Sequence, residues 1–504
     1  MVIANWMLGN PMKRKFFFFF VSLVYLLFFS TYTTPLTDYL GYDTAIFMLV
    51  GKGLLHGLIP YTDLFDHKGP ILYFIQALGQ LICPGKPGIF LLQLISLTFS
   101  IELIYKNSRF FLDEVTSLLP VLFFLILFCA TIGEGNMTEE WSLPFIVSTM
   151  YLGLKYFFRK DKLNPNISKW DSLIIGLSFG VLFLIRLNNA TVNTGIYAGI
   201  LIAFLINRQF KNMFISIIYV LLGILLIICP VAVFYYAHDS FGEMVYGTFT
   251  FNFMYASSSS KSLSTQVFLM NFARLLPLLV LIVSIVFFDK KYQLKLSYIV
   301  IPASLITFLA FISGRPYYHY FTIVIPLTTL LFVLFLKEYR AKYKKIALFA
   351  LFLILPYGWT AAKNAGNNFR FSVLHEEDAY YNESRKVLQA IPLNERNSVW
   401  FYGDYTLFLD MRSLVWNDFT PKNRFFYLQN ELIEIDPDIK AVILDEIKQP
   451  PVKWIIAEKD ALKHIAGLNE FVTKNYECIF EPGSTAKFRL HLYRLTKRNV
   501  DLAK

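Results

Sequence analysis

The fold of this chain is decided near its N-terminus, where residues 13–33 read KRKFFFFFVSLVYLLFFSTYT. An apolar run of about 20 residues is long enough to cross the hydrocarbon core of a membrane as a helix. Three basic residues precede the run, and no small-residue cleavage site follows it. We therefore expect an uncleaved first transmembrane helix with a cytoplasmic N-terminus, not a signal peptide.

The composition extends this expectation to most of the 504 residues. Hydrophobic residues make up 56% of the chain and charged residues only 16%, with 51 Phe and 30 Tyr. Soluble proteins have about 25% charged residues. These values exclude a soluble multidomain protein, a disordered chain, a collagen and a disulfide scaffold. The four cysteines lie far apart, without metal-ligand or redox spacing. The sequence predicts a polytopic, all-helical membrane protein.

We assign eleven apolar runs as transmembrane spans. They lie near residues 16–33, 88–105, 115–132, 141–157, 171–186, 190–206, 213–236, 266–288, 296–312, 320–336 and 346–359. Two further apolar segments, Thr44–Leu58 and Pro70–Cys83, are short or interrupted by glycine, so we expect both to lie flat on the membrane. Eleven spans that start from a cytoplasmic N-terminus place the C-terminus on the extracytoplasmic side. The basic residues support this orientation because they concentrate in the loops that it leaves inside.

The remainder of the chain differs in charge balance and in the length of its apolar runs. Residues 361–504 contain equal numbers of basic and acidic residues, so the whole net charge of +11 belongs to residues 1–360. Apolar runs there shorten to strand length. We predict strands at Ser398–Tyr402, Ala441–Leu444, Trp454–Ala457 and Phe488–Leu495, and helices at Glu376–Ala390 and Ala461–Lys474. The prediction is a membrane domain over 1–360 and a soluble extracytoplasmic α/β domain over 361–504, serving as a lid or in acceptor recognition.

Unusual polar residues gather on the predicted outer side of the membrane domain. The acidic ones are Asp38, Asp43, Asp63, Asp66, Glu134, Glu139, Glu140, Asp239 and Glu243. Asp43 precedes the first flat helix, where a carboxylate can act as a general base toward a substrate at the membrane surface. Lys68 precedes the second flat helix, where its charge and the helix dipole can bind a lipid phosphate. Polar groups at a membrane edge are costly unless they are paired or used.

Each of these residues also has a structural alternative. Asp43 fits the N-cap of the following helix, and Asp66 and Lys68 fit a solvated turn before a proline at the first helical position. Glu139 and Glu140 fit first-turn acids that favour the helix dipole. Snorkelling at the lipid boundary and interfacial packing account for the others, which are Arg186, Arg315 and His319. Their shared side of the membrane favours a functional site.

Five short motifs occur in a recognisable order. They are Asp43 before a flat helix, Asp66-His67-Lys68-Gly69-Pro70, Thr138-Glu139-Glu140, Ile185-Arg186-Leu187-Asn188-Asn189 and Gly314-Arg315-Pro316-Tyr317-Tyr318-His319-Tyr320. In this order the chain resembles the GT-C glycosyltransferases that depend on polyprenyl phosphate. Among these it is most similar to bacterial relatives of the protein O-mannosyltransferases and of the lipid A aminoarabinose transferase. The resemblance covers residues 1–360 and implies a GT-C fold of about eleven transmembrane helices plus interfacial helices.

The resemblance also implies a role for each matching residue. Asp43 would be the catalytic acid that deprotonates or orients the acceptor hydroxyl, with Glu139 or Glu140 at the second acidic position. The donor phosphate and sugar would be bound by Lys68, Asp66, His67, Arg186, Asn188, Arg315, Tyr318 and His319. The chain departs from many relatives at Thr44, where they carry Glu. Any second carboxylate must then come from Asp38, Glu139 or Glu140, and the presence of a divalent cation stays open.

The implied activity is transfer of a hexosyl or pentosyl group from a polyprenyl-phosphate donor to an acceptor hydroxyl. The acceptor would be a glycan, lipid or protein of the cell envelope, on the outer face of a bacterial inner membrane, and the anomeric carbon would be inverted. No nucleotide motif is expected, since a lipid-linked sugar needs no nucleotide, and nucleic acid is not a partner. Two alternatives remain: a glycolipid transporter or flippase, and an O-antigen ligase or polymerase. A transporter should show repeated halves and ionisable residues near the bilayer midplane. No internal repeat is apparent, and Glu102 is the glutamate that lies inside a predicted span.

Overall fold

The computed structural model describes most of the chain, which divides into two compact units. The described residues are 10–37, 39–132, 135–158, 167–260, 264–288, 290–312, 314–315, 317–339, 343–370, 379–403, 412, 414–415, 418–427, 429–448, 452–483 and 490–496. Unit 1 comprises Met1–Leu36, Phe90–Val233 and Ser259–Leu374, and unit 2 comprises Thr37–Ile89, Phe234–Ser258 and His375–Lys504. Two segments from the predicted membrane domain thus cluster with the C-terminal residues in unit 2. The boundary at residue 360 stays a prediction.

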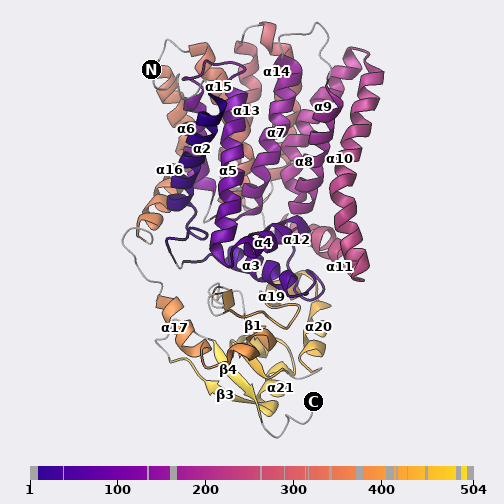
Figure 1. Cartoon of the computed structure of the whole chain (residues 1–504), viewed down its shortest axis with the longest axis vertical. Coiled ribbons are helices and arrows are strands. Elements are labelled where there is room, and N and C mark those ends of the chain that lie inside the picture. The colour runs from indigo at the N-terminus through magenta and orange to yellow at the C-terminus, as the bar shows by residue number, and fades with distance from the viewer. Residues whose placement is uncertain are drawn as a thin grey trace. The chain divides into compact units, whose positions relative to one another are not determined.

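Unit 1 is helical (Figure 1). Its elements are α2 (Pro11–Phe29), most of α5 (Lys86–Ser108), α6 (Leu118–Thr131), α7 (Thr138–Phe158), α8 (Lys169–Ile185), the 3-10 turn η1 (Leu187–Ala190), α9 (Thr191–Ile206), most of α10 (Phe210–Ala237), α13 (Thr265–Ser284), η3 (Ile285–Phe287), α14 (Lys290–Phe311), η4 (Tyr318–Val324), α15 (Ile325–Tyr339) and α16 (Tyr343–Asn368). Each of the eleven predicted apolar runs falls on one of these helices.

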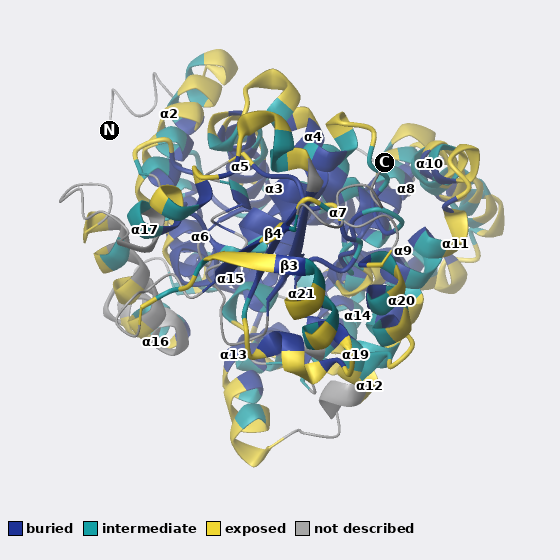
Figure 2. Ribbon diagram, turned by 90° about the horizontal axis from the view of Figure 1, so that it is seen from below, coloured by how far each residue is buried: buried dark blue, intermediate teal, exposed yellow. Residues whose placement is uncertain are grey.

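Six helical stretches among the described residues are long and apolar enough to cross a membrane. They are Lys86–Ser108, Leu187–Ile206, Phe210–Ala237, Thr265–Phe287, Tyr292–Phe311 and Tyr318–Tyr339. Helix α10 leaves large apolar side chains such as Leu221, Leu225 and Val233 exposed, as the yellow stretches on it in Figure 2 illustrate. A soluble protein rarely exposes so continuous an apolar surface, whereas lipid covers it without cost. The protein is therefore an integral membrane protein, and the total of eleven spans stays a prediction.

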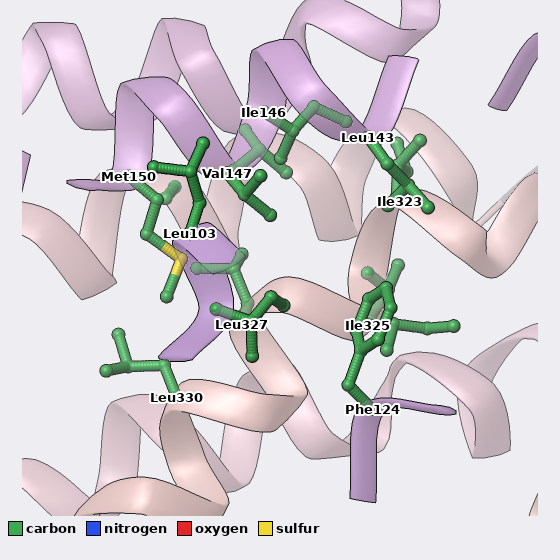
Figure 3. Packing of buried hydrophobic residues seen from close by; sticks show 14 of the residues in the cluster. Leu103, Phe124, Leu143, Ile146, Val147, Met150, Ile323, Ile325, Leu327 and Leu330 are labelled. Carbon is green, nitrogen blue, oxygen red and sulfur yellow. The ribbon is translucent and has the colours of Figure 1, made fainter. Parts of the chain in front are cut away.

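The core of unit 1 is built where several of these helices interdigitate. Figure 3 shows side chains from α5, α6, α7, η4 and α15, among them Leu103, Phe124, Met150, Ile323 and Leu327, packed against one another. Helices α9 and α14 approach so closely that a methyl group on Gly199 would overlap the backbone of Tyr298. Close approach through small residues is the usual way in which membrane helices pack.

Glu102, the glutamate inside a predicted span, is paired with basic side chains within unit 1. The Arg14 guanidinium donates to both of its carboxylate oxygens at 2.9 and 3.1 Å, and the Lys106 ammonium lies 3.3 Å away. A paired carboxylate of this kind serves packing and does not need a transport role to explain it.

Unit 2 contains both of the predicted flat helices. They are α3 (Tyr42–Leu55) and α4 (Pro70–Ile82), which pack together. A methyl group on Gly51 would overlap the side chain of Gln76, so this glycine permits the close contact. Helix α4 has Pro70 in its first turn, as expected. The N-cap of α3 is Gly41, which places Asp43 in the first turn, so the N-cap alternative for Asp43 is wrong.

The C-terminal part of unit 2 holds a four-stranded sheet. The strands are β1 (Val399–Tyr402), β2 (Trp454–Ala457), β3 (Tyr476–Phe480) and β4 (His491–Leu495), in the order β1-β2-β4-β3 with β1 and β2 parallel and the other neighbours antiparallel. The remaining elements of unit 2 are α11 (Phe241–Val245), the π-turn η2 (Tyr246–Thr250), most of α12 (Phe251–Ser260), α17 (Ala379–Leu388), η6 (Leu393–Ser398), α19 (Gln429–Ile435), α20 (Ile439–Glu446), η7 (Ala461–His464) and α21 (Leu468–Asn475).

One predicted strand is wrong, because Ala441–Leu444 lies in helix α20. Ile439, Ile443 and Ile447 are buried four residues apart, which is the spacing of one helical face. A run of four apolar residues cannot by itself distinguish a strand from a buried helix. Strand β3, with the burial pattern of one buried residue followed by exposed ones, was not predicted.

Candidate active site

The segment between α3 and α4 adopts a fixed and strained conformation. Tyr61 has φ +72°, which is unfavourable for a bulky side chain, and its amide donates to the Leu64 carbonyl at 2.8 Å. Its hydroxyl donates to the Lys68 carbonyl at 2.6 Å, and its ring packs edge-on against Tyr73. A methyl group on Gly247 would overlap the Tyr61 ring. Such strain persists only where the surroundings hold it, and it is commonest at functional sites.

Asp66 is the centre of this segment. Its side chain is 1% exposed, and its carboxylate accepts three hydrogen bonds. The donors are the His67 amide at 2.8 Å, the Tyr73 hydroxyl at 2.9 Å and the Tyr427 hydroxyl at 2.5 Å. The Lys68 ammonium lies 3.9 Å away and the His67 ring nitrogen Nδ1 3.6 Å away. Asp66 is thus a buried anchor and not part of a solvated turn.

The environment keeps Asp66 ionised. Burial by itself raises the pKa of a carboxyl group, but Lys68, His67 and the two tyrosine hydroxyls together outweigh it and lower the pKa of Asp66 below its usual value. Conversely, burial and the nearby Asp66 charge raise the pKa of Tyr427 well above its usual value. At neutral pH the arrangement is therefore a carboxylate that accepts from two neutral phenols.

Lys68 is oriented rather than free in solution. Its Nζ lies 3.0 Å from Nε2 of His67 and 5.8 Å from the centre of the Phe47 ring, and its side chain is 17% exposed. Its backbone amide donates to the Tyr73 hydroxyl at 3.1 Å, and Asn252 donates to the His67 carbonyl at 2.6 Å. Lys68 comes two residues before Pro70, the first residue of α4, so its charge adds to the positive end of that helix dipole.

Asp43 lies on the same side of α3 as this cluster. It is half-buried in the first turn, and Phe47, the ring beside Lys68, is one turn further along the same face. The charge of Asp43 also contributes to the raised pKa of Tyr427, after burial and Asp66. Unit 2 therefore brings together Asp43, Asp66, His67 and Lys68, all four of its predicted site residues.

Unit 1 holds the other predicted residues, and two of them form an ion pair. Nη1 of Arg186 donates to Oε1 of Glu139 at 2.5 Å, and the guanidinium lies 3.9 Å from the centre of the Tyr320 ring. The Glu139 side chain is 1% exposed and that of Arg186 is 22% exposed. Arg186 is thus paired and stacked, so snorkelling does not describe its environment.

Glu139 and Glu140 are both in the first turn of α7, as expected, but they differ in their partners. The oxygens of Glu140 accept from Gln93 at 2.9 Å and from the Asn136 amide at 2.8 Å. Asn136 in turn accepts from the Trp141 indole at 2.9 Å. Glu140 therefore stabilises the start of helix α7 through these hydrogen bonds. Oε2 of Glu139 is buried and has no hydrogen-bond partner among the described residues, so it is the more available carboxylate of the two.

In the Gly314–Tyr320 motif, the rings of Tyr317, His319 and Tyr320 pack against one another. Arg315 donates to the Tyr317 hydroxyl at 3.4 Å, and the His319 ring stacks 5.7 Å from Tyr317 and edge-on at 4.6 Å from Tyr320. Tyr320 also contacts Arg186, so these rings connect Arg315 to Arg186. The other two predicted residues are Tyr318, which lies 3.8 Å below the Arg274 guanidinium, and Asn188, which is exposed in η1.

Several residues that contact the predicted site residues were not themselves predicted as site residues. Tyr73 and Tyr427 hold Asp66, Tyr320 stacks on Arg186, and Arg274 stacks on Tyr318. Tyr320 follows directly after a predicted residue and could have been included on that ground. Asp38 and Glu134, predicted as outer acids, fall outside the described residues. Among the described residues no group of three or more His, Cys, Asp or Glu side chains is placed to hold a metal ion.

Comparisons with known proteins bear on the fold and on the predicted resemblance. Residues 67–236 match the family described as "Dolichyl-phosphate-mannose-protein mannosyltransferase". ArnT from Cupriavidus metallidurans, solved with undecaprenyl phosphate bound, superposes with a TM-score of 0.61 and 11% identity, over 98% of this chain and all of that one. The oligosaccharyltransferase AglB from Archaeoglobus fulgidus was solved with an inhibitory peptide and a dolichol-phosphate. It superposes with a TM-score of 0.53 and 11% sequence identity, over 96% of this chain and 74% of that one. No curated protein matches the sequence significantly.

These matches confirm the predicted resemblance. The chain has the GT-C fold, and the region that matches the mannosyltransferase family model includes Lys68 and Arg186.

Proposed function

We propose that this protein transfers a sugar from a polyprenyl-phosphate donor to an acceptor hydroxyl on the extracytoplasmic side of the membrane. The observation that carries the proposal is the Asp66-His67-Lys68 cluster in unit 2. There a buried carboxylate with three hydrogen-bond donors fixes an ammonium group immediately before the N-terminus of an apolar helix. Cationic groups and helix N-termini are the usual partners of phosphate.

The donor phosphate is the leaving group of the proposed reaction. Breaking the bond between the anomeric carbon and the phosphate oxygen develops negative charge on that oxygen. Lys68, oriented before the reaction begins, stabilises this charge without further reorganisation. Nε2 of His67 lies 3.0 Å from the Lys68 ammonium and helps to fix its position.

Asp43 is the proposed general base. An acceptor hydroxyl is a poor nucleophile until a carboxylate takes up its proton as the new glycosidic bond forms. Asp43 is half-buried on the face of α3 that carries Phe47, the ring beside Lys68. Attack from the side opposite the phosphate inverts the anomeric carbon, so an α-linked donor gives a β-linked product and the reverse.

The remaining predicted residues keep their proposed roles. Glu139 is the better candidate for the second acidic position, because Glu140 has both of its oxygens engaged. Arg186, Asn188, Arg315, Tyr318 and His319 are proposed to contact the donor. The acceptor is proposed to be a glycan, lipid or protein of a bacterial cell envelope, with the N-terminus of the chain in the cytoplasm.

The test is a reconstituted transfer reaction. Purified protein in lipid nanodiscs is supplied with a panel of polyprenyl-phosphate hexoses and pentoses together with an envelope extract as acceptor. The proposal predicts release of free polyprenyl phosphate and attachment of the sugar to one acceptor fraction, detected by mass spectrometry. Loss of the donor from one face of a vesicle without cleavage would instead identify a flippase, and elongation of an existing polymer would identify a polymerase.

A further inference from the structure

The C-terminal residues contribute a side chain directly to the cluster around Lys68. Tyr427 is buried, and its hydroxyl donates to Oδ1 of Asp66 at 2.5 Å across 361 positions of sequence. The neighbouring Arg424 carbonyl accepts from the Phe65 amide at 2.8 Å, and the Phe425 ring packs 5.0 Å from that of Phe65. The segment before α19 is therefore bonded to the segment before α4 by backbone, ring and hydroxyl contacts.

Tyr427 is held in place from the sheet side as well. Two side-chain amides lock its segment onto strand β1. Asn423 exchanges hydrogen bonds with the Phe401 backbone at 2.9 and 2.8 Å and also donates to the Phe425 carbonyl. Gln429 donates to the carbonyls of Phe401 at 3.2 Å and Phe425 at 2.9 Å. Tyr427 lies between Asn423 and Gln429 in the sequence, so the hydrogen bonds of these two side chains fix the backbone that carries its hydroxyl.

The position of Lys68 depends on Asp66. Oδ1 of Asp66, the oxygen that accepts from Tyr427, is also the oxygen 3.9 Å from the Lys68 ammonium and 2.8 Å from the His67 amide. Tyr73 holds the second oxygen from within α4. Removing the Tyr427 hydroxyl would leave the first oxygen with the His67 amide as its hydrogen-bond donor and would remove a donor that favours the charged form of the carboxylate.

We propose that Tyr427 is a positioning residue of the phosphate-binding cluster, through which the C-terminal residues hold Asp66 and thereby orient Lys68. The inference rests on the proposed role of Lys68 in binding the donor phosphate. It assigns the C-terminal residues a part in donor binding, in place of a lid or an acceptor-recognition module alone.

The experiment compares Tyr427→Phe with Tyr476→Phe in full-length protein in nanodiscs. Tyr476 is a matched control, since it is a tyrosine of the same unit that is buried to a similar degree, and its hydroxyl donates to the Val452 carbonyl at 2.9 Å instead of to Asp66. The probe is undecaprenyl phosphate, and its Kd is measured by titration calorimetry from pH 4 to pH 8. Tyr427→Phe is expected to raise this Kd roughly tenfold, as for loss of a hydrogen bond to a charged group.

Two further readouts separate positioning from general stability. The first is the acid limit of binding, which is the pH below which undecaprenyl phosphate no longer binds. In Tyr427→Phe this acid limit should move to higher pH, because Asp66 loses a hydrogen bond that favours its ionised form. In an Asp66→Asn background the same substitution should change the Kd less than about twofold, since coupled residues are not additive. If Tyr427→Phe does not fold, 3-fluorotyrosine placed at position 427 keeps the ring and strengthens the donor, and the acid limit should then move to lower pH.

The outcomes distinguish this inference from the function on which it rests. A Kd that Tyr427→Phe changes no more than Tyr476→Phe does, while Lys68→Ala weakens binding, would overturn the positioning role alone. The same holds for an acid limit that stays in place in both the phenylalanine and the fluorotyrosine proteins. A Kd insensitive to Lys68→Ala would overturn the phosphate role of Lys68, and this inference with it.

Discussion

Replacing Lys68 by alanine should weaken donor binding by one to two orders of magnitude. The ammonium group is held by Asp66 at 3.9 Å and by His67 at 3.0 Å, and its side chain is 17% exposed, so it is oriented before a phosphate arrives. Two unit charges 4 Å apart at a protein surface attract by about 4 kcal/mol. Part of this is cancelled by desolvation and by Asp66, which leaves about 1.5–3 kcal/mol for a charge-assisted hydrogen bond. The expected rise in Kd for undecaprenyl phosphate is roughly 10- to 150-fold.

Lys52→Ala is the matched control for this substitution. Lys52 lies at the other end of α3 in the same unit and pairs with Asp418, whose side chain is 78% exposed. An exposed pair contributes less than about 1 kcal/mol, so this variant should bind undecaprenyl phosphate as the wild type does. Both variants are compared by titration calorimetry in nanodiscs, with the melting temperature as a check of folding. A Kd for Lys68→Ala within a factor of about two of the control would refute the reasoning, since that change is below 0.5 kcal/mol.

Three other perturbations have defined outcomes. Asp43→Asn should lower the rate of sugar transfer by roughly 10²- to 10⁴-fold, as expected for loss of a general base, with little change in the Kd for undecaprenyl phosphate or in melting temperature; a wild-type rate would remove Asp43 from the mechanism. Arg186→Ala leaves Glu139 buried without its partner and should cost about 3 kcal/mol of folding stability, seen as a lower melting temperature that the added change Glu139→Gln largely restores. Burial raises the pKa of Glu446 to about 7, so its contribution to stability is fully present below the unfolded value of 4.5 and is lost as the pH rises toward 7. Glu446→Gln should therefore flatten the decline in melting temperature between pH 4.5 and 7, and an unchanged pH profile would contradict the burial.

Much of the helical architecture follows from apolar length alone. The runs that predict spans all fall on helices, and both short segments, α3 and α4, are helices with nearly the predicted ends. Apolar length and glycine or proline placement determine these features locally. The apolar run in α20 was misassigned because four residues carry no clear periodicity.

The sequence predicted which residues belong to the candidate site, but it did not predict which of them contact one another. Glu139 and Arg186 were both singled out, yet their ion pair spans 47 positions, and nothing in either motif points to the other. Tyr427 was missed for the same reason, since a single tyrosine in a C-terminal segment has no local signal for a contact with Asp66. Contacts between distant segments depend on how the helices and the sheet pack, which a single sequence does not encode in a readable pattern.

The central claim is most directly tested by locating a bound polyprenyl phosphate. A structure of the protein in nanodiscs with undecaprenyl phosphate should place the phosphate group within hydrogen-bond distance of the Lys68 ammonium, near His67 and the N-terminus of α4. Asp43 should lie on the side from which an acceptor can approach the anomeric position. Density for the phosphate at another surface, with Lys68 still turned toward Asp66, would contradict the account.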